Sequence, residues 1–282
     1  MKYGIWRHES ALGNSAEQTV CLADFIDKNK DENPVIYVEH EFQKDFALCI
    51  RNVKPENIIF YKNISGFEKD MYLPHNVSIL PKDIFMPDLY FENMPNYPSA
   101  WKDIKRLLLQ FPYDIYSNNL NLPENCILMS IRESGTYDKR VDGSMCEPER
   151  FVNPEIFFNT ALHFAEKGFK VVRIGDPNQT PMPKHKNITD LAITKNKTML
   201  DDLFLISKCK VFLSCDSGVW PMAGGMKKPL ILSNVCSPFR SHPPKLEIVN
   251  WLNQGNTKVI FKNRSLKDNT KEELVSAINE FL

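Results

Sequence analysis

The sequence predicts an α/β protein built from two Rossmann-like, doubly wound domains that face each other across a cleft. Three observations lead to this fold class. Short apolar runs alternate with helical patterns, which is typical of parallel sheets covered by helices. The 282 residues, 43% of them hydrophobic, are enough for two domains of about 100 to 200 residues each. A polar stretch with two prolines separates two such series of strands and helices.

The first series begins with a strand expected at residues 3–6. A loop of small residues follows it and leads into a helix expected at 16–28, where apolar residues recur at near-helical spacing. A second strand and helix are expected at 35–38 and 41–50. An apolar run at 57–61 predicts a third strand.

The middle of the chain breaks this alternation. Residues 65–99 are rich in Pro, Asn and Asp, and we expect them to be irregular apart from a short strand at 77–80. A helix is predicted over 100–111, and Pro112 ends it. The polar residues 112–125 are interpreted as the linker. The two predicted domains are residues 1–118 and 119–282.

The second series is more regular. Five strands are expected, at residues 126–132, 170–174, 188–193, 210–215 and 229–233. Helices are expected at residues 154–167, 198–207, 220–226 and 269–282. In doubly wound sheets, ligands bind beyond the carboxyl ends of the strands, so the candidate residues were sought there.

Composition excludes several classes of function. Lys and Arg together number 35, as do Asp and Glu, and a general nucleic-acid binder would carry a basic excess. No apolar run approaches the ~18 residues of a membrane span, and the first eight residues lack a secretory apolar region. We therefore expect a cytoplasmic protein. The seven Cys form no CxxC pair, so they are interpreted as small buried side chains in a reducing compartment.

Arg132 is the first candidate, because it ends a buried strand and precedes a Ser-Gly turn at Gly135. A guanidinium there could hold a phosphate through two hydrogen bonds. The alternative is a surface Arg paired with a neighbouring Glu. The next candidates are Arg173, Gly175 and Asp176, where the glycine would let the backbone approach a ligand; the alternative is an ordinary turn.

A third group follows the strand at 210–215. Asp216, Ser217 and Gly218 precede an expected helix, so backbone N–H groups there could receive an anion. The alternative is a helix cap without a ligand. Arg240, after the strand at 229–233, is a further candidate anion contact. Gly13 and Asn14, which follow the first strand, are also assigned to binding of the same ligand.

Several motifs are missing. The chain has no GxGxxG, Walker, GxSxG or HExxH motif and no DxD run for a metal-bound diphosphate. We therefore expect neither a metal nor another cofactor.

The region 131–238 resembles bacterial glycosyltransferases of the GT-B type, which are linked with surface polysaccharides. The resemblance rests on Ile131-Arg132-Glu133-Ser134-Gly135, Gly168 to Pro177, Asp202 to Phe212, Ser217-Gly218, and Pro229 with Asn234. It implies a metal-independent transfer of a sugar from a nucleotide-activated donor to a glycan or other hydroxyl. It also implies an acceptor-side domain at 1–118 and a donor domain at 119–282.

More distantly, the chain is similar to the heptosyltransferases, which carry a D-[ST]-G loop like Asp216-Ser217-Gly218. They also carry a general-base Asp after the first strand, where this chain has Asn14. An amide cannot take a proton from an acceptor hydroxyl. Glu17, Glu9 and His8 are therefore the candidate bases, with Glu17 expected on the first turn of the helix. The alternative for both glutamates is a solvated carboxylate at a helix start.

Two other functions stay open. One is a sugar-nucleotide hydrolase or epimerase on the same scaffold, which His8 leaves open. The other is a non-catalytic sugar-nucleotide-binding or assembly subunit, which Asn14 keeps open. The expected partners are a nucleotide sugar and a glycan or lipid-linked acceptor, not nucleic acid. A lipid-linked acceptor would bring the protein to the inner face of the membrane, with Lys102, Lys105 and Arg106 as one peripheral contact or, alternatively, a solvated helix face.

Overall fold

The structure is a computed structural model of the 282-residue chain. It describes the following residues: 3–5, 12–28, 35–38, 40–60, 84–85, 109–117, 123–133, 151–194, 196–215, 218–235, 256–262 and 268–282.

The first sheet has four strands in the order β3-β2-β1-β4, and every neighbouring pair is parallel. The strands are β1 (Tyr3–Ile5), β2 (Val35–Val38), β3 (Ile58–Phe60) and β4 (Ile84–Phe85). In the described part of this half, α1 (Leu12–Lys28) connects β1 to β2, and α2 (Glu41–Leu48) lies between β2 and β3. β2 and β3 extend the sheet on one side of β1, and β4 adds to the other side. This arrangement is typical of doubly wound folds.

The second sheet has six parallel strands in the order β10-β9-β8-β5-β6-β7. They are β5 (Ile127–Ser130), β6 (Val171–Ile174), β7 (Ile188–Asp190), β8 (Val211–Cys215), β9 (Leu230–Val235) and β10 (Thr257–Phe261). Numbered within the sheet, this is the Rossmann order 3-2-1-4-5-6. The topological switch point lies between β5 and β8.

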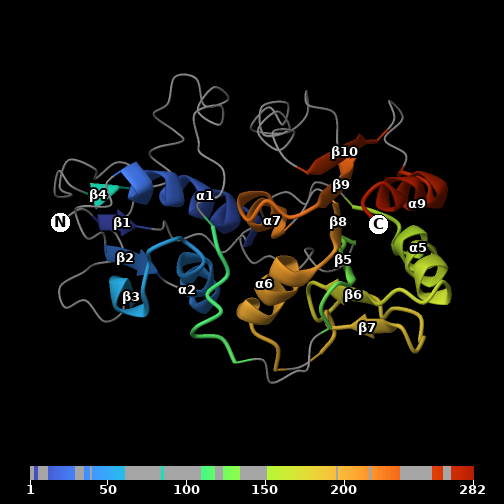
Figure 1. The fold of residues 1–282 in the computed structure, drawn as a ribbon, viewed down its shortest axis with the longest axis horizontal. Helices are drawn as coiled ribbons and strands as arrows, with labels where there is room; N and C mark the ends of the chain where they lie inside the picture. The colour runs from blue at the N-terminus through green and yellow to red at the C-terminus, as the bar shows by residue number, and fades with distance from the viewer. Residues whose placement is uncertain are drawn as a thin grey trace.

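Helices cover both faces of the second sheet (Figure 1). They are α5 (Pro154–Glu166), α6 (Met199–Lys208), α7 (Trp220–Gly225) and α9 (Lys271–Asn279). Phe212 of β8 packs in the core that contains residues of α6 and α7, whereas its neighbours Val211 and Leu213 pack in the core that contains residues of α5 and α9. Alternate residues therefore serve opposite faces, which explains why the parallel strands are continuously apolar.

Local sequence signals set the ends of these helices. Asn153 caps α5 by accepting a hydrogen bond from the N–H of Glu155, and Pro154 occupies the first helical position. Thr198 and Asp201 form a reciprocal capping box at the start of α6, and Thr270 and Glu273 do so for α9.

The two sheets are joined by packed helices and by the segment 109–117. α1 packs against α7, and α2 packs against α6. Leu109 forms an isolated antiparallel bridge with Ile50. The rings of Phe111 and Tyr116 lie 5.6 Å and 5.0 Å from the ring of Phe204 on α6. The segment 109–117 therefore contacts elements of both halves.

The structure confirms the predicted α/β class with two Rossmann-like parallel sheets and corrects some boundaries. α1 begins at Leu12, not Ala16, so Gly13 and Asn14 are helical. Leu109 is in a bridge, not in the helix expected at 100–111. β4 and β10 were not predicted. The strand expected at 77–80 lies outside the described residues. The domain boundary between residues 118 and 119 stays a prediction.

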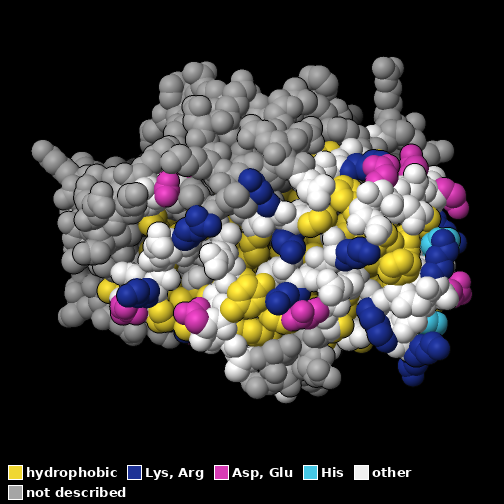
Figure 2. All heavy atoms as spheres, in the orientation of Figure 1, with side chains coloured by type: hydrophobic (Ala, Val, Ile, Leu, Met, Phe, Trp, Pro, Cys, Tyr) yellow, Lys and Arg dark blue, Asp and Glu magenta, His cyan; other side chains and the backbone are white. Residues whose placement is uncertain are grey.

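Charged side chains of both signs are spread over the face shown in Figure 2, with hydrophobic side chains between them. In the part of the chain that the structure describes, no helix is long and apolar enough to cross a membrane. Cys49, Cys126, Cys209 and Cys215 are buried and form no disulfide, as expected for these four residues.

Candidate functional site

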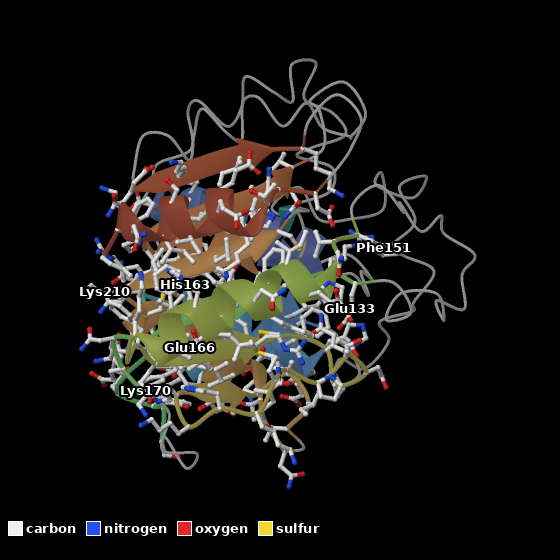
Figure 3. The ribbon with its side chains drawn as sticks, turned by 90° about the vertical axis from the view of Figure 1, so that its right-hand side faces the viewer. Glu133, Phe151, His163, Glu166, Lys170 and Lys210 are labelled. Atoms are coloured by element: carbon white, nitrogen blue, oxygen red, sulfur yellow. The ribbon has the colours of Figure 1, made fainter. Side chains whose placement is uncertain are left out.

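The candidate site lies at the carboxyl edge of the second sheet, around the switch point between β5 and β8. The elements after these two strands pack on opposite faces of the sheet, and in doubly wound folds the ligand crevice lies at this point. Figure 3 places Glu133 and Phe151 at this edge and Lys170 and Lys210 at the opposite one.

Arg132 lies two residues after the end of β5 and is 7% exposed. Its backbone N–H donates a hydrogen bond to the sulfur of Cys215, the last residue of β8, over 3.0 Å. Its guanidinium carbon lies 5.6 Å from the centre of the Phe151 ring. The strand ends that flank the crevice are thus joined at Arg132, and an aromatic face supports the guanidinium.

Glu133 joins the end of β5 to the turn after β6. Its carboxylate accepts a hydrogen bond from the N–H of Thr180 over 2.7 Å. The side-chain amide of Gln179 donates to the carbonyl of Ile131 over 2.7 Å. These contacts fix the turn 175–180 against residues 131–133. Gln179 was not singled out from the sequence, because a Gln in a turn carries no signal of its own.

Gly175 is explained by its backbone conformation and by the closeness of a neighbouring side chain. Its φ is +150°, and a Cβ at this position would lie 2.4 Å from the side-chain oxygen of Gln179. The close approach is therefore made by the protein's own Gln179. Asp176 accepts hydrogen bonds from both the backbone and the side-chain nitrogen of Asn178, an Asx turn that shapes the same loop.

Arg173 lies within the sheet and is 1% exposed. It donates two hydrogen bonds, of 2.9 Å and 2.7 Å, to the carboxylate of Asp190 on β7. Glu133 lies 3.9 Å away, and the Phe158 ring centre is 5.5 Å from the guanidinium carbon. This engagement favours a structural role for Arg173 over the predicted contact with a donor.

Gly218 is the described residue of the predicted Asp216-Ser217-Gly218 loop. Its φ is +73°, and among the described residues other than its chain neighbours no atom lies within 4 Å of the position that a Cβ would take. The left-handed backbone, not crowding, therefore explains this glycine. It precedes α7, which has six residues and whose N-cap residue, Val219, makes no side-chain capping hydrogen bond.

The candidate residues of the first half give a partial picture. Gly13, Asn14 and Glu17 lie in α1, and their side chains are outside the structural description. Glu17 is more than one turn past the start of α1, so its expected place on the first turn was wrong. The remaining candidates lie outside the described residues: His8, Glu9, Gly135, Asp216, Ser217 and Arg240.

Two charged residues at the same edge were missed by the sequence analysis. Lys262 follows β10, and its ammonium lies 2.8 Å from a carboxylate oxygen of Asp268. Their side chains are 3% and 19% exposed. The signal that could have found them is the apolar run of β10, which was not interpreted as a strand. No group of three or more His, Cys, Asp or Glu that could hold a metal occurs among the residues with described positions.

Comparisons with known proteins agree on the fold. No protein-family model and no curated protein matches the sequence. Escherichia coli ADP-heptose LPS heptosyltransferase II aligns with 14% identity and a TM-score of 0.60, over 100% of this chain and 98% of its own. A family 9 glycosyl transferase of Veillonella parvula DSM 2008 aligns with 14% identity and a TM-score of 0.57, over 99% and 97%.

The E. coli heptosyltransferase WaaC with ADP aligns with 11% identity and a TM-score of 0.53, over 100% of both chains. These similarities extend over the whole chain. At such low identity they establish a shared fold and leave the activity to be argued from the site.

Proposed function

We propose that the protein is a glycosyltransferase that moves a sugar from a nucleoside-diphosphate donor to an acceptor hydroxyl. The observation that carries this proposal is the position of Arg132, a cation at the crevice between β5 and β8 that is bonded through its backbone to the end of β8. Dinucleotides and nucleotides bind at this point of Rossmann-like sheets. The full-length fold similarity to heptosyltransferases supports it.

Arg132 would neutralise the diphosphate that leaves. The C–O bond between the sugar and the diphosphate breaks, and negative charge develops on the departing phosphate oxygen. A guanidinium held at that oxygen stabilises this charge, and its planar donors fit two phosphate oxygens at once. With this cation in place, the proposed reaction requires no metal.

The loop 216–218 would form the other wall of the donor site. It follows β8 directly, so it starts on the far side of the crevice from Arg132. The left-handed backbone at Gly218 turns the chain there and would let N–H groups of the loop face the phosphates. Asp216 would orient the groups that donate hydrogen bonds to the phosphates, or it would hold a sugar hydroxyl.

The acceptor would bind from the first half of the chain. A base there takes the proton of the acceptor hydroxyl while the hydroxyl oxygen forms the new bond to the sugar. Glu17, Glu9 and His8 are the proposed bases, because the amide of Asn14 cannot accept that proton. A glycan or lipid-linked hydroxyl is the proposed acceptor, and the protein would act in the cytoplasm.

The test is a transfer assay that follows both products. The purified protein is incubated with ADP-, UDP- and GDP-sugars and an oligosaccharide acceptor mixture, and mass spectrometry detects the acceptor gain and the released diphosphate together. An increase in acceptor mass by one sugar together with release of the nucleoside diphosphate supports glycosyl transfer. Release without acceptor gain supports a hydrolase, and binding without either product, restored to transfer by Asn14→Asp, supports a subunit that has lost its base.

A further inference from the structure

Three consecutive backbone positions are held where the chain returns to the carboxyl edge of the second sheet. Lys262 donates from its ammonium to the carbonyl of Phe151 over 2.8 Å. The N–H of Val152 donates to the carbonyl of Arg132 over 2.9 Å. The N–H of Asn153 donates to Asp268 over 2.6 Å. Residues 151–153 are therefore fixed relative to β5 and β10 at once.

Lys262 and Asp268 also form an ion pair with each other. The ammonium of Lys262 lies 2.8 Å from one carboxylate oxygen of Asp268, while the other oxygen accepts from Asn153. The pair therefore carries no net charge. A charge as deeply buried as that of Lys262 is costly to remove from water, and an apolar pair of similar size would often give equal stability. Stability alone is a weak reason for this arrangement.

The Lys262–Asp268 pair acts on Phe151, whose ring packs against Arg132. Its carbonyl is fixed by Lys262, and its ring lies 5.6 Å from the guanidinium carbon of Arg132. The next residue, Val152, bonds to the backbone of Arg132 itself. The chain of contacts thus runs from β10, three strands away from β5 in the sheet, to the candidate anion-binding side chain.

The base of this network is fixed as well. The backbone N–H of Lys262 donates to the carbonyl of Val235 over 2.9 Å. Asn269, next to Asp268, exchanges two hydrogen bonds with Asn234, of 2.6 Å and 2.8 Å. Asn234 and Val235 are the last two residues of β9. Lys262 and Asp268 are consequently held by the sheet, and a rigid support is what the placement of an anion-binding side chain requires.

We propose that the Lys262–Asp268 ion pair is a positioning device that holds the Phe151 ring against Arg132 and so sets the guanidinium for the donor diphosphate. The functional part of this inference rests on the proposed donor role of Arg132. Lys262 acts through Phe151 and does not contact the donor. Its removal should weaken donor binding only while Arg132 is present.

The experiment is a double-mutant cycle. Dissociation constants for ADP, GDP and UDP are measured by calorimetry on the wild type, Arg132→Ala, Lys262→Met/Asp268→Leu, and the triple variant. The paired substitution removes both charges together, so that neither is left buried alone. The expected result is a dissociation constant about tenfold higher in the paired variant and no further change when it is added to Arg132→Ala.

The inference would be overturned if the paired substitution changed the dissociation constant by the same factor in the wild type and in Arg132→Ala. It would also be overturned if the dissociation constant changed in neither protein. Lys262→Arg keeps the positive charge beside Asp268, so this variant should retain most of the wild-type affinity for the nucleoside diphosphates. Unfolding free energies of all variants identify any loss that reflects folding alone.

A second measurement is independent of any ligand. The side-chain Nε–H resonance of Arg132 in a ¹⁵N spectrum should move in the paired variant, while that of Arg173 stays in place. An unmoved Arg132 resonance would overturn the positioning role, whatever the ligand. If the wild type binds none of the three diphosphates while the resonance moves, the donor proposal fails and the positioning of Arg132 by the pair stands.

Discussion

The backbone N–H of Arg132 points at the sulfur of Cys215, with 3.0 Å between the nitrogen and the sulfur. These residues end or follow β5 and β8, the neighbouring strands at which the sheet order reverses. The contact therefore places the backbone of Arg132 beside the end of β8, the strand that precedes the 216–218 loop. The proposed donor site depends on this relationship.

Arg132→Ala should weaken the binding of a nucleoside diphosphate by about 10- to 100-fold. The reason is the loss of charge-assisted hydrogen bonds to phosphate, each worth about 1.5–3 kcal/mol. Isothermal calorimetry with ADP, GDP and UDP measures the change. Lys210→Ala is the matched control, because Lys210 lies at the opposite edge of the sheet (Figure 3) and its loss should leave affinity unchanged.

Gly175→Ala should lower the free energy of unfolding by about 1–3 kcal/mol. The new methyl group would collide with the Gln179 side chain, and the φ of +150° is unfavourable for alanine. Urea unfolding of Gly175→Ala, Gln179→Ala and the double variant separates the two causes. If the collision matters, the double variant loses less than the sum of the single ones; full additivity would contradict this account.

Arg173→Met should destabilise the protein by about 3–5 kcal/mol, because it leaves the Asp190 carboxylate without its buried partner. Replacing the pair together, with Arg173→Met/Asp190→Leu, should recover part of this loss. Thermal and urea unfolding provide the measurement. A folded Arg173→Met variant with normal stability and lost donor affinity would instead favour the sequence-based prediction that Arg173 binds the donor.

Asp45 on α2 should make stability depend on pH. Burial raises its pKa to about 6, although Lys44 and the N–H of Leu200 on α6 act in the opposite direction. Between about pH 4 and pH 6 the folded state keeps a proton that the unfolded state loses. The free energy of unfolding therefore falls as pH rises through this window, by about 2 kcal/mol for this partly exposed group.

Asp45→Asn should remove that part of the pH dependence and raise stability at pH 7, since an amide carries no charge to bury. Urea unfolding at pH 4.5 and pH 7 measures both effects. Asp114→Asn serves as the control, because Asp114 is exposed in the 109–117 segment. An unchanged slope in Asp45→Asn would show that Asp45 does not titrate in this window.

The regular second half was predictable because its strands are fully buried. In β5, β6 and β8 every residue is buried, and apart from Arg173 in β6 and the serines at positions 130 and 214 each strand is apolar in the sequence. Arg132 was singled out from its place after such a strand, and its role in donor binding stays a prediction. β4 was missed because two residues carry no periodicity, and α1 starts early because its first turn tolerates Gly13 and Asn14, where few internal hydrogen bonds exist to lose.

The roles of individual charges were less predictable. Arg132 and Arg173 both lie on or just after a strand, and the sequence does not distinguish them. The difference arises from Asp190 on the neighbouring strand β7, which engages Arg173 through two hydrogen bonds. Lys262 and Asp268 became relevant only when the sheet order brought the end of β10 to the same edge. Tertiary pairing, which a single sequence does not display, decided these roles.

The most direct test of the donor site is a thermal-shift measurement of the wild type and Arg132→Ala with ADP, GDP, UDP, TDP and CMP. A ligand at 100 times its dissociation constant adds about 2.7 kcal/mol of stability. The account predicts that at least one diphosphate raises the melting temperature of the wild type and that Arg132→Ala loses the shift. No shift from any nucleotide, or an equal shift in the variant, would contradict a diphosphate site at Arg132.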